Sequence, residues 1–156
     1  MIKGLKKGIV ALITAGALVF VLGNPNTYAA SYTDFGPASF ATEDGKYELT
    51  IRTTSVEKNV TIWVYDLYRV NRNSGAVTSM NGDTSPLSVR LCNASTGNCT
   101  AFKSFWEGNS SAIFTNMKAG TFYVDIRDSW ANYYFKGKVA AKTYSWNPDD
   151  CWLDCN

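Results

Sequence analysis

The sequence predicts an all-β protein, an antiparallel two-sheet β-sandwich that is stabilised by disulfides. Hydrophobic and polar residues alternate in short runs through the body of the chain, and a period of two is typical of half-buried strands. Glycine, asparagine, serine and proline separate these runs at intervals of roughly ten residues. No segment after residue 30 combines a helical period with capping residues. We therefore expect about seven or eight strands.

The first thirty residues are predicted to be an export signal and are left out of the fold. Lys3, Lys6 and Lys7 precede the uncharged apolar run 9–22, which has the length of a signal h-region and is short for a membrane-spanning helix. Small residues follow, so we expect cleavage near residue 30. The prediction is a secreted, extracellular protein with a single domain over 31–156 and no stable membrane span after removal of the signal.

The charge balance of the mature part gives no support to a nucleic-acid partner. The whole chain has 15 basic and 13 acidic residues. Three of the lysines belong to the signal, so the remainder is nearly neutral. A surface that binds nucleic acid or anionic lipid electrostatically needs an excess of positive charge.

Four cysteines, Cys92, Cys99, Cys151 and Cys155, lie in the mature part, and an even number in an exported chain favours disulfides. Three pairings are possible. We favour Cys92 with Cys99, which flank a predicted turn between two strand ends, and Cys151 with Cys155, which close a short loop. A zinc site is disfavoured because the spacings match no common knuckle and the chain has no histidine.

The predicted strands, in chain order, mostly have one buried face. Their inward residues are Tyr47, Leu49 and Ile51; Leu87, Val89 and Leu91; Phe122, Val124 and Ile126; and Tyr133, Phe135, Val139 and Ala141. We also assign Phe114 to the core.

The run 59–70 is an exception, because both of its faces are apolar. Val60, Ile62 and Val64 point one way, and Trp63, Tyr65 and Leu67 point the other. The run is therefore predicted to be a central strand or to have its second face covered. The segment 71–86 that follows is rich in turn formers, with a ragged strand around 76–80.

The stretch from about Pro86 to Tyr144 resembles the second half of the small β-sandwiches appended to secreted bacterial enzymes, the pre-peptidase C-terminal domains. The resemblance is carried by an aromatic residue, a short turn and Ala-Gly-Thr before an aromatic strand, here Phe114, Met117, Ala119, Gly120, Thr121, Phe122 and Tyr123. It implies a jelly-roll-like fold and, by analogy, a role in binding or presentation.

The residue inventory argues against an enzyme. Without histidine, every Ser-His, Cys-His and His-metal arrangement is excluded. A pair of carboxylates could still act as in glycoside hydrolysis, but among Asp66, Glu107, Asp125 and Asp128 the sequence singles out no pair. We therefore expect no catalytic residues and no cofactor.

A metal site is also not expected. Asp149, Asp150 and Asp154 lie beside the terminal cysteines, and such oxygen ligands can hold calcium. Their spacing is not that of an EF-hand, so a solvated acidic tail is the better interpretation. The segment 81–85 is likewise not expected to bind calcium.

Aromatic residues supply the ligand-binding candidates. Trp106 and Trp130 lie in predicted turns, off the alternating pattern, and Tyr134 is predicted to face outward. Exposed Trp and Tyr are common anchors of binding surfaces, although half-exposed aromatics also cap the ends of sandwiches. We select Trp106, Trp130 and Tyr134 as ligand-binding residues. Trp146 and Trp152 are expected to fold the tail back on the body.

A row of lysines, Lys136, Lys138 and Lys142, shares the outward face of Tyr134. We interpret it as protection of an exposed sheet edge.

The function predicted from the sequence is that of a non-catalytic binding or accessory module for an extracellular polysaccharide or cell-wall polymer. Two alternatives stay open. One is a secreted effector, an antimicrobial protein or an inhibitor with a protein target, and the other is an extracellular matrix component.

Overall fold

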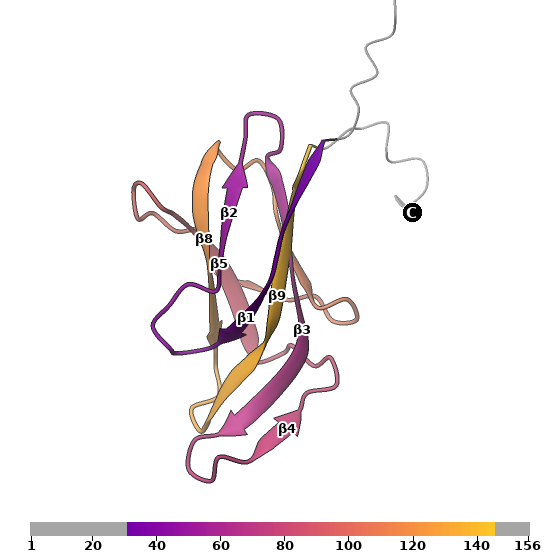
Figure 1. The fold of residues 1–156 in the computed structure, drawn as a ribbon, viewed down its shortest axis with the longest axis vertical. Helices are drawn as coiled ribbons and strands as arrows, with labels where there is room; N and C mark the ends of the chain where they lie inside the picture. The colour runs from indigo at the N-terminus through magenta and orange to yellow at the C-terminus, as the bar shows by residue number, and fades with distance from the viewer. Residues whose placement is uncertain (1–30, 146–156) are drawn as a thin grey trace, which may run out of the picture.

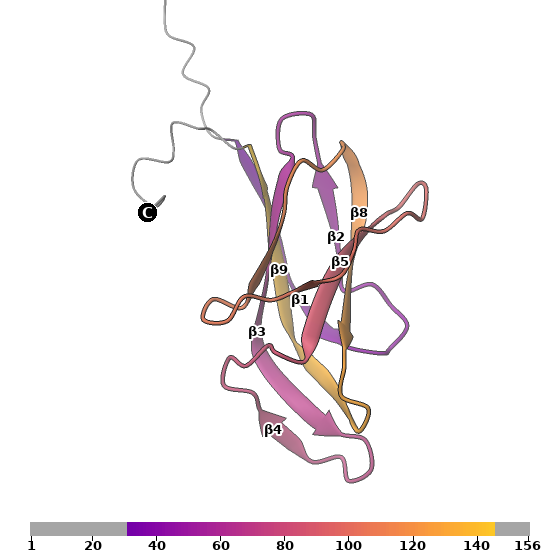
Figure 2. The same cartoon turned by 180° about the vertical axis from the view of Figure 1, so that it is seen from behind.

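Residues 31–145, the part of the chain that the computed structural model describes, form two antiparallel β-sheets packed face to face (Figure 1 and, from behind, Figure 2). The strands are β1 (Tyr32–Ala41), β2 (Leu49–Thr53), β3 (Asn59–Asn71), β4 (Val77–Ser79), β5 (Leu87–Asn93), β6 (Lys103–Ser104), β7 (Ser111–Phe114), β8 (Gly120–Asp128) and β9 (Tyr133–Tyr144). The predicted fold class is confirmed. The predicted signal 1–30 and the tail with Trp146, Cys151, Trp152 and Cys155 lie outside the described residues.

The strand order has the connectivity of a jelly roll. Sheet A has the order β1-β9-β3-β4, with β7 also pairing with β3, and sheet B has the order β2-β8-β5-β6. Apart from the connections β3–β4 and β5–β6, every connection crosses from one sheet to the other. Within residues 31–145, no helix is long and apolar enough to cross a bilayer.

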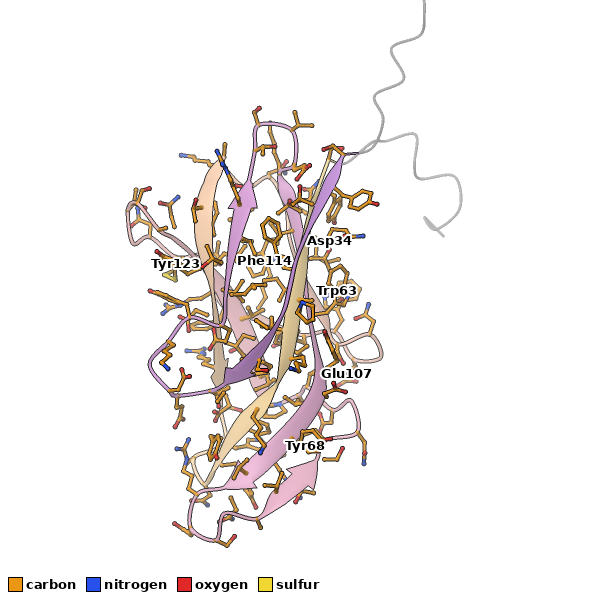
Figure 3. All side chains as sticks on the ribbon, viewed as in Figure 1. Asp34, Trp63, Tyr68, Glu107, Phe114 and Tyr123 are labelled. Atoms are coloured by element: carbon orange, nitrogen blue, oxygen red, sulfur yellow. A yellow bond between two sulfur atoms is a disulfide. The ribbon has the colours of Figure 1, made fainter. Side chains whose placement is uncertain are left out.

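The core fills the space between the sheets, as the position of Phe114 in Figure 3 shows. The side chains of Val89, Val124, Phe135 and Val139 are completely buried, and each such burial contributes about 1.5–3 kcal/mol. The predicted inward residues of β5, β8 and β9 are confirmed, because all of them are buried or packed against this core.

Tyr47 is the one inward residue of the alternating strands that was predicted wrongly. Its side chain is 53% exposed and stacks on the ring of Tyr123, with centroids 4.6 Å apart and planes at 10°. The cause is that β2 begins only at Leu49. The backbone of residue 47 therefore does not continue the alternation of the strand.

A β-bulge in β3 explains the two apolar faces of 59–70. The pairing of β3 with β9 shifts by one residue between Tyr65 and Tyr68, and Asp66 has a positive φ of 51°. The extra residue turns Leu67 inward, to 4% exposure, so its predicted outward orientation is wrong. β3 is indeed a central strand, as predicted.

Gly137 is the residue of β9 that accommodates the bulge. A Cβ atom at Gly137 would lie 2.9 Å from the carbonyl oxygen of Tyr65 and 3.3 Å from that of Asp66. No side chain fits at such distances, so a glycine is needed where the bulged backbone approaches β9.

The predicted disulfide between Cys92 and Cys99 is present. Cys92 lies in β5 and Cys99 forms an isolated bridge with it, so the bond closes the turn 93–98. The ragged strand expected around 76–80 is β4.

Candidate functional site

Aromatic side chains gather on the face of sheet A that points away from sheet B, which we call the aromatic face. On β3, Val64 is buried between the sheets, so its neighbours Trp63 and Tyr65 point to the opposite side. After the bulge, Tyr68 also points outward. Tyr65 and Tyr68 are each 41% exposed. Figure 3 shows Trp63 and Tyr68 on the same side of the molecule and Tyr123 on the other.

Trp106 extends the aromatic face beyond β7. Phe105 is buried in the core, whereas Trp106 is 66% exposed, so the chain alternates between inside and outside at this point. Trp106 bridges Ser111, and Ser111 pairs in turn with Trp63 on β3. The two tryptophans therefore lie in one row across the face, about 10 Å apart at two strand spacings.

Lysines of β9 complete the aromatic face. Lys136 pairs with Tyr68 and Lys138 with Tyr65, both across from β3. The interpretation of these lysines as protection of a sheet edge is wrong, because β9 is hydrogen-bonded to β1 on one side and to β3 on the other. Their ammonium groups stand on an open face instead, where the Nζ of Lys138 donates to Ser39 at 2.8 Å.

Lys142, the third lysine of the row, is partly neutralised. Its Nζ lies 3.5 Å from a carboxylate oxygen of Asp34 on β1, the strand at the edge of sheet A.

Three hollows lie along this side of the molecule. The largest, of about 770 Å³, is lined by Tyr68, Lys136, Lys138, Asp44 and Asp66 with backbone around Gly137. It therefore combines two ammonium groups, two carboxylates and a phenol.

The two smaller hollows adjoin the loop between β6 and β7. One, of about 430 Å³, is lined by Trp63, Tyr65 and Asn109 among others. The other, of about 410 Å³, is lined by Asp83, Glu107 and neighbouring backbone. Glu107 lies on the same side as Trp63 and Tyr68 in Figure 3.

The three residues selected from the sequence do not share one surface. Trp106 and Tyr134 both face outward from sheet A, but Tyr134 pairs with Val70, seven residues along β3 from Trp63, which is roughly 20 Å at the rise of a strand. Arg72 lies over the ring of Tyr134 at 6.0 Å and pairs with Glu43.

Trp130 points toward the interior. It is half-buried against the core, with its ring 5.6 Å from that of Phe135 and 5.8 Å from that of Tyr133, both edge-on. Arg69 covers it, with the guanidinium carbon 5.9 Å from the ring centre. In this position Trp130 caps one end of the sandwich.

Trp63, Tyr65 and Tyr68 were not among the ligand-binding residues predicted from the sequence. The sequence does contain a signal for such a surface, because the second apolar face of 59–70 must either pack against other residues or contact a ligand. Only the placement of β3 shows that Trp63 and Tyr65 belong to the open side of a sheet.

The carboxylates considered for catalysis do not all lie together: Asp125 and Asp128 are on β8 and line one hollow, whereas Asp66 is on β3 and Glu107 is in the loop before β7. Asp125 accepts a hydrogen bond from the Nε of Arg90 at 2.6 Å, and Asp128 accepts from the hydroxyl of Thr42 and the amide of Trp130. Asp66 is exposed at the bulge. Between residues 31 and 145, no group of three or more His, Cys, Asp or Glu side chains is arranged to hold a metal ion.

Three acidic residues outside that set, Glu48, Glu57 and Asp83, have shifted pKa values within residues 31–145. Burial, chiefly, raises the pKa of Glu48 to about 7, with Asp125 and Asp44 adding to the effect, although the amide of Ile126 donates to its carboxylate at 2.9 Å. Hydrogen bonds from the amide and hydroxyl of Ser85 lower the pKa of Asp83. Nothing in the sequence distinguishes Glu48 from an ordinary exposed glutamate.

No protein-family model matches the chain, and a search of curated proteins likewise finds no match.

Proposed function

We propose that the protein is a secreted, non-catalytic binding domain that holds an extracellular glycan or cell-wall polymer on the aromatic face of sheet A. The observation that carries the proposal is the set of exposed aromatic side chains, Trp106, Tyr65 and Tyr68 beside Trp63, on one open sheet face. Single exposed hydrophobic residues are ordinary, whereas a group of them on one surface marks an interaction site.

The chemistry of the face suits a sugar polymer. The C–H faces of pyranose rings stack on aromatic rings, and their hydroxyl groups need both donors and acceptors nearby. Lys136 and Lys138 supply donors, and Asp44 and Asp66 supply acceptors, in the hollow next to Tyr68. The two ammonium groups and two carboxylates balance, which favours a ligand without a large net charge over a polyanion.

The shape of the face suits an extended ligand. The aromatic residues stand on β3 and on the loop before β7, and the hollows follow one another along the same side. A polymer lying across the sheet could contact several of them at once, so weak single contacts would add up through multivalency.

Secretion is part of the proposal. The Cys92–Cys99 disulfide supports an oxidising compartment, as the predicted export signal does. A glycan or cell-wall ligand lies in the same compartment.

The test is retention of the purified mature protein on insoluble peptidoglycan, chitin and cellulose. Trp106→Ala and Tyr68→Ala remove exposed rings from the aromatic face, and Tyr123→Ala removes a ring from the opposite sheet as the matched control. We expect retention on at least one polymer, reduced about tenfold or more by the first two variants, since stacking and hot-spot aromatics contribute about 1–3 kcal/mol each. The control is expected to bind like the wild type.

Two results would contradict the proposal. One is the absence of retention on all polymers, which would favour a secreted effector with a protein target. The other is self-assembly that rises with concentration and is abolished by Trp106→Ala, which would favour a matrix component. Circular dichroism of each variant shows whether the sandwich is retained.

A further inference from the structure

Arg127 stands on the outward face of sheet B, on the opposite side of the molecule from the aromatic face. Two neighbours fix its side chain. Its guanidinium carbon lies 3.7 Å from the ring centre of Phe102, and its Nε donates to the hydroxyl of Ser88 at 3.1 Å. In the described part of the chain, no carboxylate forms an ion pair with Arg127. Stacking on Phe102 and the hydrogen bond of the Nε thus orient the guanidinium, and its terminal amino groups take no part in that hydrogen bond.

Arg90 provides an internal comparison. It stacks on the same ring of Phe102, with its guanidinium carbon at 4.6 Å. Its Nε, however, is bound to Asp125 at 2.6 Å, so its charge is compensated. Two guanidinium groups therefore share one phenyl ring, and only one of them has an anionic partner. An anion at Arg127 would compensate the second guanidinium as Asp125 compensates the first.

The surface beside Arg127 is hollowed and rich in hydroxyl groups. A hollow of about 340 Å³ is lined by Arg127, Phe102 and four serines, Ser85, Ser88, Ser104 and Ser129. The hydroxyl of Ser88 accepts from Arg127, so its own proton is directed elsewhere. Asp128 also lines the hollow, but both of its oxygens already accept hydrogen bonds, from Thr42 and from the amide of Trp130.

We propose that this hollow, the Arg127 hollow, binds an oxyanion, the phosphate or carboxylate group of a ligand. A guanidinium presents a planar fork of donors that matches a carboxylate or phosphate with two parallel hydrogen bonds. Stacking on Phe102 and the bond to Ser88 fix the fork before binding, so little side-chain entropy is lost on contact. The hydroxyls of Ser88 and Ser104 supply further donors that an oxyanion accepts, whereas those of Ser85 and Ser129 donate to Asp83 and to the carbonyl of Pro86. The proposal is independent of the glycan proposal, since it concerns the other sheet.

The experiment is an amide NMR titration of the mature protein with sodium phosphate and, separately, with sodium galacturonate, at constant ionic strength. We expect saturable shifts at residues around Ser88, Ser104 and Arg127 with at least one of the two anions. Saturation with phosphate alone assigns a phosphate source, saturation with galacturonate alone assigns a uronate source, and both outcomes support an oxyanion site.

Three variants identify the groups responsible. Arg127→Gln is expected to weaken binding about tenfold or more, because a charge-assisted hydrogen bond contributes about 1.5–3 kcal/mol. Arg127→Lys keeps the charge and loses the fork of donors, so its affinity for the anion is expected to lie between those of the wild type and Arg127→Gln. The matched control is Arg52→Gln, an equal change of charge at an exposed arginine of β2 in the same sheet, and we expect it to bind like the wild type.

The proposal is overturned if neither anion gives saturable shifts, if sodium chloride alone gives the same shifts, or if Arg52→Gln weakens binding as much as Arg127→Gln. Retention of the dispersed amide spectrum in each variant shows that the fold is intact. Since the aromatic face is untouched by these variants, polymer retention remains a separate measurement whose failure would not affect this result.

Discussion

Replacing Glu48 by glutamine tests whether the raised pKa of this carboxyl makes the stability of the fold depend on pH. The carboxylate of Glu48 accepts the Ile126 amide at 2.9 Å just before β2 begins. Burial raises the pKa of this carboxyl from 4.5 to about 7, and the nearby carboxylates of Asp125 and Asp44 add to the effect. Glutamine keeps the acceptor oxygen and cannot ionise.

The sign of the effect follows from proton binding. Between about pH 4.5 and pH 7 the folded protein keeps the proton on Glu48, whereas the unfolded chain has released it. The folded state therefore binds more protons, and the free energy of unfolding falls as the pH rises through this window. Above pH 7 the loss is complete.

The magnitude follows from the size of the shift. Each tenfold change in proton affinity corresponds to about 1.4 kcal/mol, so the shift of the Glu48 pKa from 4.5 to about 7 gives an upper limit of about 3 kcal/mol. Glu48 is only half-buried, and solvent screening reduces this to about 1–2 kcal/mol. Glu48→Gln is therefore expected to be more stable than the wild type by that amount at pH 8 and equally stable at pH 4.

Urea unfolding followed by tryptophan fluorescence at pH 4, 6 and 8 measures this difference. Glu107→Gln, the same change at an exposed glutamate in the loop before β7, is the matched control and is expected to follow the wild-type curve. The reasoning is refuted if the stability curves of the wild type and Glu48→Gln stay parallel from pH 4 to pH 8.

Three further changes test the fold. Gly137→Ala should lower the free energy of unfolding by about 1–3 kcal/mol, because its Cβ would meet bulge carbonyl oxygens at 2.9 and 3.3 Å; an unchanged melting temperature would contradict the role of the bulge. Replacing both Cys92 and Cys99 by serine should lower the free energy of unfolding by about 2 kcal/mol in denaturant melts, the value for so short a loop. Equal stability of this variant and of a wild-type protein shown to contain the disulfide would contradict this. Burial alone would raise the pKa of Glu57, but hydrogen bonds from hydroxyl groups lower it, so ionised Glu57 stabilises the fold at pH values above the pKa that this residue has in the unfolded chain. Glu57→Gln should therefore lower the free energy of unfolding at pH 7, and the difference from the wild type should shrink as the pH falls.

The alternation of residues predicted the fold wherever a strand is regular. Val89 and Phe122 face inward because their strands pair without interruption across sheet B. The prediction failed at Tyr47, where the strand starts two residues later than the pattern suggests. It also failed at Leu67, because one additional residue in β3 reverses every orientation that follows.

The candidate site was only partly predictable, for a related reason. The exposure of Trp106 followed from its place off the alternating pattern. Tyr65 and Tyr68 could not be assigned, because a strand with two apolar faces does not show which face is covered. For Trp130, a position between two strands suggested exposure, but the chain there turns back against Phe135.

The position of β3 in the sheet has a consequence for the stability of the proposed binding surface. The amides of β3 are paired with β9 on one side and with β4 and β7 on the other, so they are expected to be among the slowest in the protein to exchange with deuterium. Trp63, Tyr65 and Tyr68 would then keep their spacing through the local opening that loosens hairpin tips and terminal strands. A ligand on this surface would meet an already ordered partner, and loss of affinity on heating should coincide with global unfolding instead of preceding it.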